Sequence, residues 1–279
     1  MSSFPGVEGP LPFYDMHVHT HYSPDSDSEM EKLCVRAADL GLLGICFTDH
    51  AEFAPGDHVP GAAEMEDMFA EIERLRDTYG DRLTIMRGIE IGYYRGAASD
   101  IHSFLDSYEF DFILGSVHVS GDTRYSFPRS FSEGEDPLDY FTPYLEDMRH
   151  MIAEIDLDAV GHFDLPKRYG PKYEDVAGFV AQSPLWGRVE EFLAELVDRG
   201  LLLEINASGL RQNADALYPC GDVLDLYREM GGEMITLGSD SHEPGNLGWG
   251  LRRAARAARR AGFREAVYFL ERKATRYSI

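Results

Sequence analysis

Side chains that commonly bind transition metals stand at the end of nearly every strand-like segment of this chain. Histidine and carboxylate hold zinc, manganese and iron. A barrel of parallel strands brings all its strand ends together at one mouth. The pattern therefore favours a fold in which the strand ends converge on a polynuclear metal site. The residues are His17 and His19 in YDMHVH, His50 in GICFTDH, Glu90 in RGIEIGYY, His118 in ILGSVH, His162 in AVGHFD, and Asp240 and His242 in TLGSDSH.

Seven strand-like runs alternate with helical patterns along the chain. Several runs lack polar alternation, as expected of strands buried on both faces. The alternation predicts a parallel sheet with right-handed crossovers. An open sheet places its site at one switch point, so ligand types at most strand ends favour a closed α/β barrel of seven strands. The predicted strands cover 14–18, 43–48, 84–91, 110–117, 159–161, 202–205 and 234–237, and helices beyond the first cover 63–79, 138–154, 184–199, 223–230 and 251–261.

The first helix has the clearest pattern. Ser28 and Glu31 form a candidate capping box, and Gly41 is placed to end the helix. The apolar residues are spaced to form one stripe facing the core. They are Met30, Leu33, Cys34, Ala37 and Leu40.

Length and composition indicate one globular domain. The chain has 279 residues, of which 44% are hydrophobic and 27% charged, and no Ser/Gly/Pro-rich linker divides it. We expect a flexible segment at 1–12 and a barrel at 13–279. Neither a signal peptide nor an apolar run long enough for a bilayer is found, so a soluble, cytoplasmic protein is expected. Cys34 and Cys46 are interpreted as packing residues in a reducing compartment.

The net charge of −23 argues against a protein that wraps nucleic acid, and no membrane partner is expected. A small anionic substrate is still compatible, because three divalent ions would outweigh the carboxylates of Asp25, Glu90 and Asp240. The arginine-rich helix 251–261 is interpreted as pairing with acidic neighbours on the exterior. The sequence does not indicate an oligomeric state.

Spacing within the motifs supports shared ions. Residues two apart in a strand point to the same side, so His17 and His19 can reach one ion, and Asp240 and His242 have the same spacing. Glu90 lies inside an apolar strand, where a glutamate is rarely buried without a partner.

In these motifs the chain resembles the polymerase-and-histidinol-phosphatase (PHP) family of metal-dependent phosphoesterases. HVH, the acid Asp25, TDH, GIE, GSVH, GHFD and GSDSH occur in the family's order over almost the whole chain. LEINASGLR, a following YP and the C-terminal FLERK resemble the histidinol-phosphate phosphatase branch. The resemblance implies a distorted seven-stranded TIM-type barrel and hydrolysis of L-histidinol phosphate to L-histidinol and phosphate in histidine biosynthesis.

The resemblance also implies three divalent ions, with zinc, manganese and iron all compatible with the ligand set. A bridging hydroxide activated at Glu90, Asp240 and His242 would attack phosphorus. Some relatives carry His at the position of Asp25. By this carry-over the first ion is bound by His17, His19, Glu90 and Asp240, the second by Glu90, His118 and His162, and the third by Asp25, His50 and His242.

Candidate substrate-binding residues lie in loops after strand ends. Arg168 and Arg211 carry guanidinium groups suited to phosphate oxygens, and His58 lies in a Gly/Pro-rich loop after TDH. Asp164 is a candidate for orienting His162. Glu204 is left open between facing the mouth and pairing with a basic neighbour.

Three alternatives stay open. A PHP phosphoesterase for nucleotides or other small phosphate esters needs the same site. An amidohydrolase acting on C–N bonds also has H-x-H after its first strand, but TDH and His242 supply ligands for a third ion that it does not need. A noncatalytic PHP module would have lost ligands, whereas all nine positions here keep competent side chains.

Overall fold

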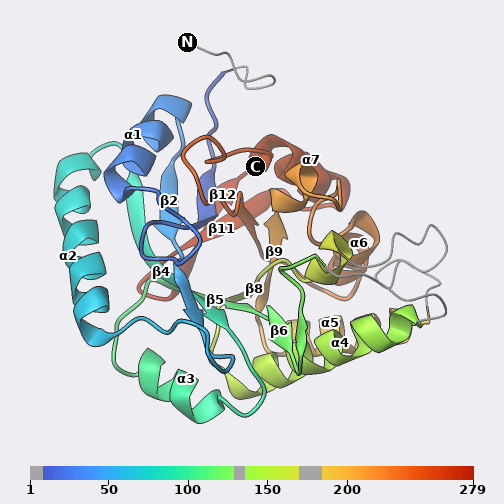
Figure 1. Ribbon diagram of the computed structural model, residues 1–279. Helices are drawn as coiled ribbons and strands as arrows, with labels where there is room; N and C mark the ends of the chain where they lie inside the picture. Colours follow the sequence, from blue (N-terminus) through green and yellow to red (C-terminus); the bar gives the residue numbers. More distant parts are fainter. Residues whose placement is uncertain (1–8, 129–135, 170–183) are drawn as a thin grey trace.

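The computed structural model describes residues 9–128, 136–169 and 184–279 (Figure 1). Its elements alternate between strands and helices along most of the chain. The strands are β1 Tyr14–Val18, β2 Gly44–Phe47, β3 His50–Glu52, β4 Thr84–Gly92, β5 Phe112–Ser116, β6 Val119–Ser120, β7 Thr123–Arg124, β8 Ala159–Val160, β9 Leu202–Asn206, β10 Ile235–Gly238, β11 Glu265–Leu270 and β12 Lys273–Ser278. The helices are α1 Met30–Leu40, α2 Ala62–Tyr79, α3 Ala98–Leu105, α4 Pro137–Glu154, α5 Trp186–Asp198, α6 Gly221–Glu229 and α7 Leu251–Arg260, with 3-10 turns at Leu165–Arg168 and Ser208–Arg211.

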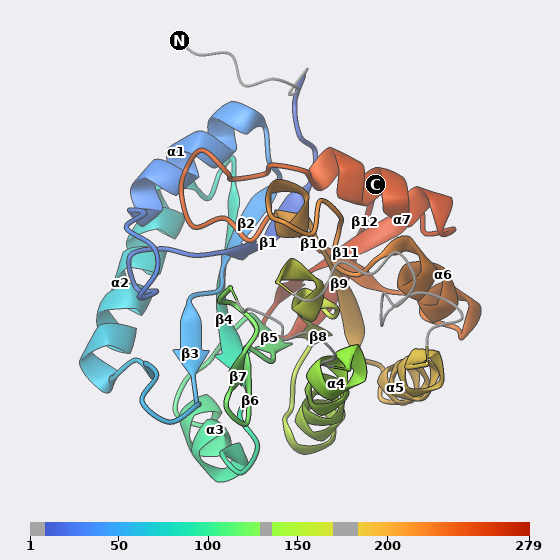
Figure 2. The ribbon, with the colours of Figure 1, turned by 45° about the vertical axis from the view of Figure 1, so that its right-hand side comes forward.

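A parallel barrel forms the centre of the molecule, with the α-helices around it (Figure 2). Its strands follow the order β1-β2-β4-β5-β8-β9-β10. The two ends of this order meet through backbone hydrogen bonds, from Asp240 N to His17 O at 2.9 Å and from His19 N to Ser241 O at 2.8 Å. The predicted (β/α) barrel with seven main strands is thereby confirmed.

β3 is a strand that the sequence did not predict. β2 ends at Phe47, and the chain then shifts so that β3 pairs with β4, His50 opposite Glu90 and Glu52 opposite Gly92. A Cβ at Gly92 would clash with the Glu52 carboxylate, which His118 and His50 hold in place. Since His50 and Glu52 are two residues apart, the shift directs both side chains toward the same cavity.

α1 shows why the first helical pattern is reliable. The five residues of the predicted apolar stripe are all buried. Gly41 ends the helix with φ +70° and donates its N–H to the last turn. The predicted capping box is wrong, because the Ser28 hydroxyl donates instead to the His242 carbonyl at 3.0 Å. Ser28 therefore ties the start of α1 to the loop after β10.

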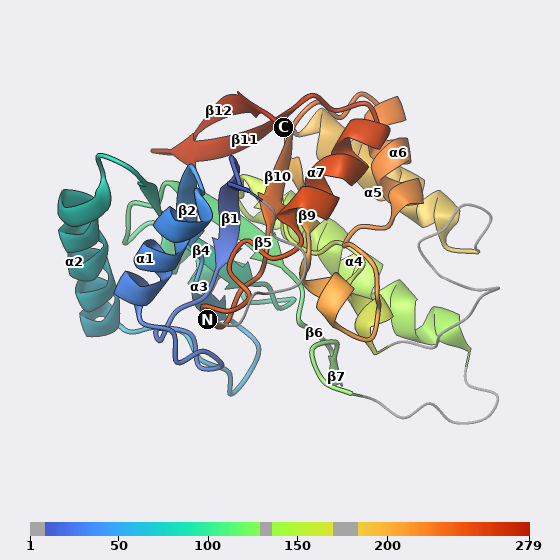
Figure 3. The same ribbon diagram turned by 90° about the horizontal axis from the view of Figure 1, so that it is seen from above.

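The floor of the barrel is closed by the antiparallel β11–β12 hairpin, which was not predicted. In Figure 3 it lies at the end of the barrel opposite the β6–β7 hairpin. Phe269 packs against Phe112 with the rings tilted and their centroids 5.1 Å apart, and Tyr268 stacks on Tyr14 at 4.0 Å. Inward-facing residues of the strands form one apolar cluster with the hairpin: Met16, Cys46, Met86, Phe112, Leu114, Ala159, Leu202, Val267 and Phe269.

Several further expectations can be compared with the structure. Within the predicted flexible segment, 1–8 lie outside the described residues, while Leu11 is buried and donates its N–H to Leu40 O. Cys34 and Cys46 are buried and unbridged, as expected. In the part of the chain that the structure describes, no helix has the length and apolar character needed to cross a bilayer.

Four arginines of α7 do not show the ion pairs that the sequence analysis expected, as far as the described residues extend. Leu251, Ala254, Ala255 and Ala258 pack inward, and the arginines alternate with them on the outer face. Among the residues described, no acidic side chain forms an ion pair with the exposed guanidinium groups of this helix. These belong to Arg253, Arg256, Arg259 and Arg260.

Candidate metal centre

The predicted ligands meet at the carboxyl ends of the barrel strands, beside a cavity of about 580 Å³. Asp25, His50, Glu90 and His118 line this cavity, together with His162, Asp240 and His242. His17 and His19 lie beneath them, with no exposed surface. All nine positions singled out from the sequence are therefore gathered in one place.

The Glu90 carboxylate is the centre of the cluster. Its Oε1 lies 3.0 Å from His162 Nε2 and 3.6 Å from His118 Nε2. Its Oε2 lies 3.4 Å from His17 Nε2 and 3.0 Å from His50 Nδ1. One carboxylate thus contacts histidines that lie in, or just after, four other strands, which is the arrangement expected of a bridging ligand.

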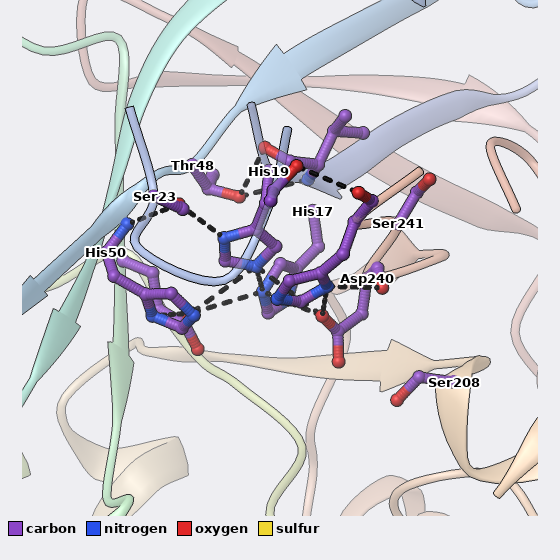
Figure 4. Close-up of polar contacts among 12 residues, drawn as sticks. His17, His19, Ser23, Thr48, His50, Ser208, Asp240 and Ser241 are labelled. Carbon is purple, nitrogen blue, oxygen red and sulfur yellow. Dashed lines mark hydrogen bonds and ion pairs between the residues drawn. The ribbon is translucent and has the colours of Figure 1, made fainter. Parts of the chain in front are cut away.

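His17, His19 and Asp240 form a second group at the junction of β1 and β10 (Figure 4). The two Nε2 atoms are 3.0 Å apart, and Asp240 Oδ1 lies 3.8 Å from His17 Nε2 and 3.4 Å from His19 Nε2. Ligand atoms about 2.0 Å from a tetrahedral zinc ion would be about 3.3 Å from one another. The observed separations suit ligands that share one ion.

Asp25 completes a third group toward the cavity. Its carboxylate lies 3.1 Å from His242 Nε2 and 3.7 Å from His50 Nε2. His242 Nδ1 is also 3.4 Å from Asp240 Oδ1, so the third group adjoins the second. Since Asp25 is 56% exposed, this side of the cluster is open to solvent.

Two glutamates and one serine form hydrogen bonds with the Nδ1 atoms of three histidines in the cluster. Glu204 Oε1 lies 2.7 Å from His17 Nδ1, and Glu52 Oε1 lies 2.7 Å from His118 Nδ1. A carboxylate only accepts, so each histidine donates from Nδ1 and turns Nε2 toward Glu90, and Nε2 can bind a metal ion once it carries no proton. Glu204 therefore faces the barrel interior, which the sequence had left undecided.

Ser23 orients His19 in the same way. The Ser23 hydroxyl donates to Asp49 Oδ1 at 2.7 Å and lies 3.1 Å from His19 Nδ1. Asp49 also accepts from the Thr20 hydroxyl at 2.8 Å. Because the Ser23 proton is committed to Asp49, the Ser23 oxygen accepts from His19. Sequence reasoning missed these residues, although Asp49 stands inside the TDH motif.

The expected role of Asp164 is wrong. It accepts from the backbone N–H of Cys220 at 2.8 Å and pairs with Lys167 at 2.5 Å, rather than contacting His162. Among the described residues, His162 Nδ1 has no hydrogen-bond partner. The Asp164 carboxylate is therefore paired with Lys167 and not with the His162 imidazole.

Burial and neighbouring charge determine the protonation of the cluster. Burial alone would raise the pKa of Glu90, but His17, His50 and His118 outweigh it and hold this pKa well below its usual value. Burial would lower the pKa of His17, but Glu204, Glu90 and Asp240 raise it well above the usual value. The carboxylates are therefore ionised at neutral pH and attract a cation, either a proton or a metal ion.

The residues present fit divalent metal ions. Imidazole and carboxylate oxygen form the mixed set preferred by zinc, manganese and iron. The buried Oε2 of Glu90 and Nδ1 of His50 lie 3.0 Å apart, but within the described part of the chain neither atom makes a well-directed hydrogen bond. Buried polar atoms that lack well-directed hydrogen bonds are costly unless another group satisfies them. Glu52 and Glu204 also make the cluster more acidic than the sequence analysis assumed.

The candidate substrate-binding residues divide into two kinds. Arg168 and His58 line the cavity, and His58 Nε2 is 3.1 Å from Glu64. Arg211 instead donates to the backbone carbonyls of Ser239, at 2.8 Å, and Asp240. Arg211 therefore braces the end of β10, whereas the cavity walls include Arg168 and His58.

The chain is similar to known proteins over most of its length. A family model described as "PHP domain" matches residues 15–208. A histidinol-phosphatase of Lactococcus lactis is 30% identical over 268 residues, covering 91% of this chain and 93% of the relative. A probable histidinol-phosphatase of Deinococcus radiodurans is 28% identical over 264 residues, covering 93% and 97%.

Solved structures show the same fold. The crystal structure of the L. lactis histidinol phosphate phosphatase, complexed with zinc, L-histidinol and phosphate, has a TM-score of 0.83 at 29% identity and covers 94% of this chain and 98% of that one. A putative histidinol phosphatase from Listeria monocytogenes, at 20% identity, has a TM-score of 0.73 and shares the fold.

Proposed function

This chain belongs to the PHP domain family, and from that premise we propose that it is a metal-dependent phosphomonoesterase that hydrolyses L-histidinol phosphate to L-histidinol and phosphate. The observation that carries the proposal is the convergence of histidines on Glu90, with ligand-type atoms 3.0 to 3.6 Å from its carboxylate. Relatives named for this activity align over most of their length. The cytoplasmic location stays a prediction.

The proposed ligand sets follow the family pattern. Three overlapping groups of side chains support more than one ion, and Glu90 contacts members of each. Zinc in the L. lactis structure makes zinc one candidate, and manganese and iron suit the same donors. The first ion would be held by His17, His19, Glu90 and Asp240, the second by Glu90, His118 and His162, and the third by Asp25, His50 and His242.

When bound, such ions lower the pKa of a coordinated water toward about 7, which supplies hydroxide at neutral pH, and they neutralise phosphoryl oxygens. The chain's own residues prepare this chemistry. Glu204, Ser23 and Glu52 fix the histidine rings, so little reorganisation is needed on binding. Glu90, Asp240 and His242 are the proposed catalytic residues, since they hold the reacting centre.

Arg168 is the proposed phosphate clamp. It lines the cavity beside His162 and Asp240, and among the described residues its buried Nε has no hydrogen-bond partner. A guanidinium group donates two parallel hydrogen bonds to phosphate oxygens. Arg211 supports the site from behind Asp240, and His58 is the proposed contact on the opposite loop.

The competing functions use the same barrel. A phosphatase for nucleotides or other small esters would need the same clamp and ligands. An amidohydrolase is disfavoured, because Asp25, His50 and His242 form a further ligand group beside the pair on β1. Fold alone does not determine the substrate.

The test is a phosphate-release screen across histidinol phosphate, nucleotides and simple alkyl phosphates, with metal content measured on the same sample. We expect a preference for histidinol phosphate, and loss of activity after chelation that added metal restores. His17→Ala and Asp240→Ala should lower kcat by orders of magnitude. His150→Ala is the matched control, because this exposed histidine pairs with Glu154 in α4. Equal activity of the site variants and the control would refute the metal mechanism.

A further inference from the structure

Phe127 is a large apolar side chain that faces the cavity rather than the core. It is 59% exposed, more than any other exposed large hydrophobic residue described. It lines the same cavity as Glu90, Arg168 and His242. Isolated apolar residues on a surface are ordinary. An exposed phenylalanine at the mouth of a metal-lined cavity has a surface available to a ligand.

The segment that carries Phe127 is fixed to the metal centre. β5 is followed by His118 and then by the β6–β7 hairpin, which projects at the mouth end of the barrel in Figure 3. Tyr125 is fully buried, donates its backbone N–H to His118 O at 2.9 Å, and bonds through its hydroxyl to Tyr140 O at 3.0 Å. Phe127, two residues later, is therefore held close to the ligand His118.

A second contact ties the hairpin to the opposite loop. Arg124 Nη1 and Nη2 each lie 2.8 Å from a carboxylate oxygen of Asp57. Both residues line the cavity. This bidentate pair stiffens the rim and leaves little net charge there. Beside this neutralised pair, Phe127 offers an apolar surface to a ligand in the cavity.

We propose that Phe127 determines substrate specificity by packing against the heteroaromatic ring of the substrate. The inference rests on the proposed function and extends it. With the phosphate at the metal cluster and Arg168, the remainder of the substrate extends toward the rim. A phenyl face stabilises an imidazole by stacking, and an imidazolium by a cation–π contact. Phosphate esters without a ring gain nothing from this contact.

The experiment compares metal-loaded wild type, Phe127→Ala and Phe127→Tyr on two substrates. 2-Aminoethyl phosphate keeps the phosphate ester and the ammonium group of histidinol phosphate but has no ring. Phe127→Ala should raise KM for histidinol phosphate by roughly three- to tenfold, leave kcat within about twofold, and leave KM for 2-aminoethyl phosphate unchanged. Phe127→Tyr, which keeps the aromatic ring, should have the wild-type KM.

Binding gives a second readout. L-Histidinol should bind Phe127→Ala more weakly by a similar factor in calorimetry, while inorganic phosphate binds equally. Leu43→Ala is the control, because Leu43 is 40% exposed and is not among the cavity residues. Equal KM changes on both substrates, or none, would overturn the role of Phe127. A wild type that does not prefer histidinol phosphate would instead refute the proposed function.

Discussion

Glu204→Gln tests whether a carboxylate that is hydrogen-bonded to a metal-ligand histidine determines the affinity for metal. Glu204 is 1% exposed. Its Oε1 accepts from His17 Nδ1 at 2.7 Å, and its Oε2 accepts from the His162 backbone N–H at 2.8 Å. Glutamine has the same shape, but one oxygen becomes an NH₂ group that cannot accept. One of the two hydrogen bonds must therefore be lost or reversed in direction.

The orientation of the amide decides which of the two hydrogen bonds changes. If the NH₂ faces His162, two donors meet, and the buried N–H without a partner costs about 1–3 kcal/mol of stability. If the NH₂ faces His17, the ring must carry its proton on Nε2, the atom that lies 3.4 Å from Glu90. That tautomer cannot bind a metal through Nε2. Losing a group that orients a ligand typically lowers metal affinity 10- to 100-fold.

The assay has two parts. Equilibrium dialysis of metal-free protein against zinc or manganese, with metal measured by mass spectrometry, gives Kd. Urea unfolding of the metal-free protein gives stability. Glu229→Gln on α6 is the control, because this carboxylate is exposed. Wild-type Kd and wild-type unfolding for Glu204→Gln would refute the positioning role argued from its contacts.

Three other predictions concern the scaffold. Burial raises the pKa of the Cys34 thiol and of the Cys220 thiol to about 12. Because the reactive thiolate forms only as the pH approaches that value, iodoacetamide at pH 8 should label both cysteines only after the protein unfolds. Rapid labelling of the native protein would contradict this prediction. Gly41→Ala should lower the free energy of unfolding by about 1–2 kcal/mol, because φ is +70° and the new Cβ would lie 2.9 Å from Pro10 Cβ; an unchanged urea midpoint would contradict it. Phe269→Ala should cost about 3–5 kcal/mol by leaving a cavity under the barrel, measured in the same way, and a loss below about 1 kcal/mol would argue against a packed floor.

The ligand positions could be predicted because each depends on a local pattern. A strand of buried aliphatic residues ends in a histidine or acid, and parallel topology brings such ends together. His17 with His19 needed only the two-residue repeat of a strand. Glu90 needed only the cost of burying an unpaired carboxylate. These inferences require no knowledge of which strands are neighbours.

The groups behind the ligands could not be predicted in the same way, because they depend on pairing between distant segments. Glu52 reaches His118 only because the chain shifts after Asp49 to pair with β4. Glu204 reaches His17 because β9 lies beside β10, next to β1. Ser28 fitted a local capping rule, yet its hydroxyl contacts a carbonyl more than 200 positions away. Tertiary contact overrode the local preference.

The hairpin beneath the barrel has a consequence for how the protein is made. Val267 and Phe269 cover Phe112 and Met16 from below, but they are translated after every strand that they cover. Until these residues have left the ribosome, the nascent barrel exposes apolar surface at this end. Chaperones and proteases recognise such surface. Premature termination between α7 and β11 would thus yield a chain that contains every metal ligand but leaves the apolar end of the barrel exposed. We expect cellular quality control to degrade such a chain, although its metal site is complete.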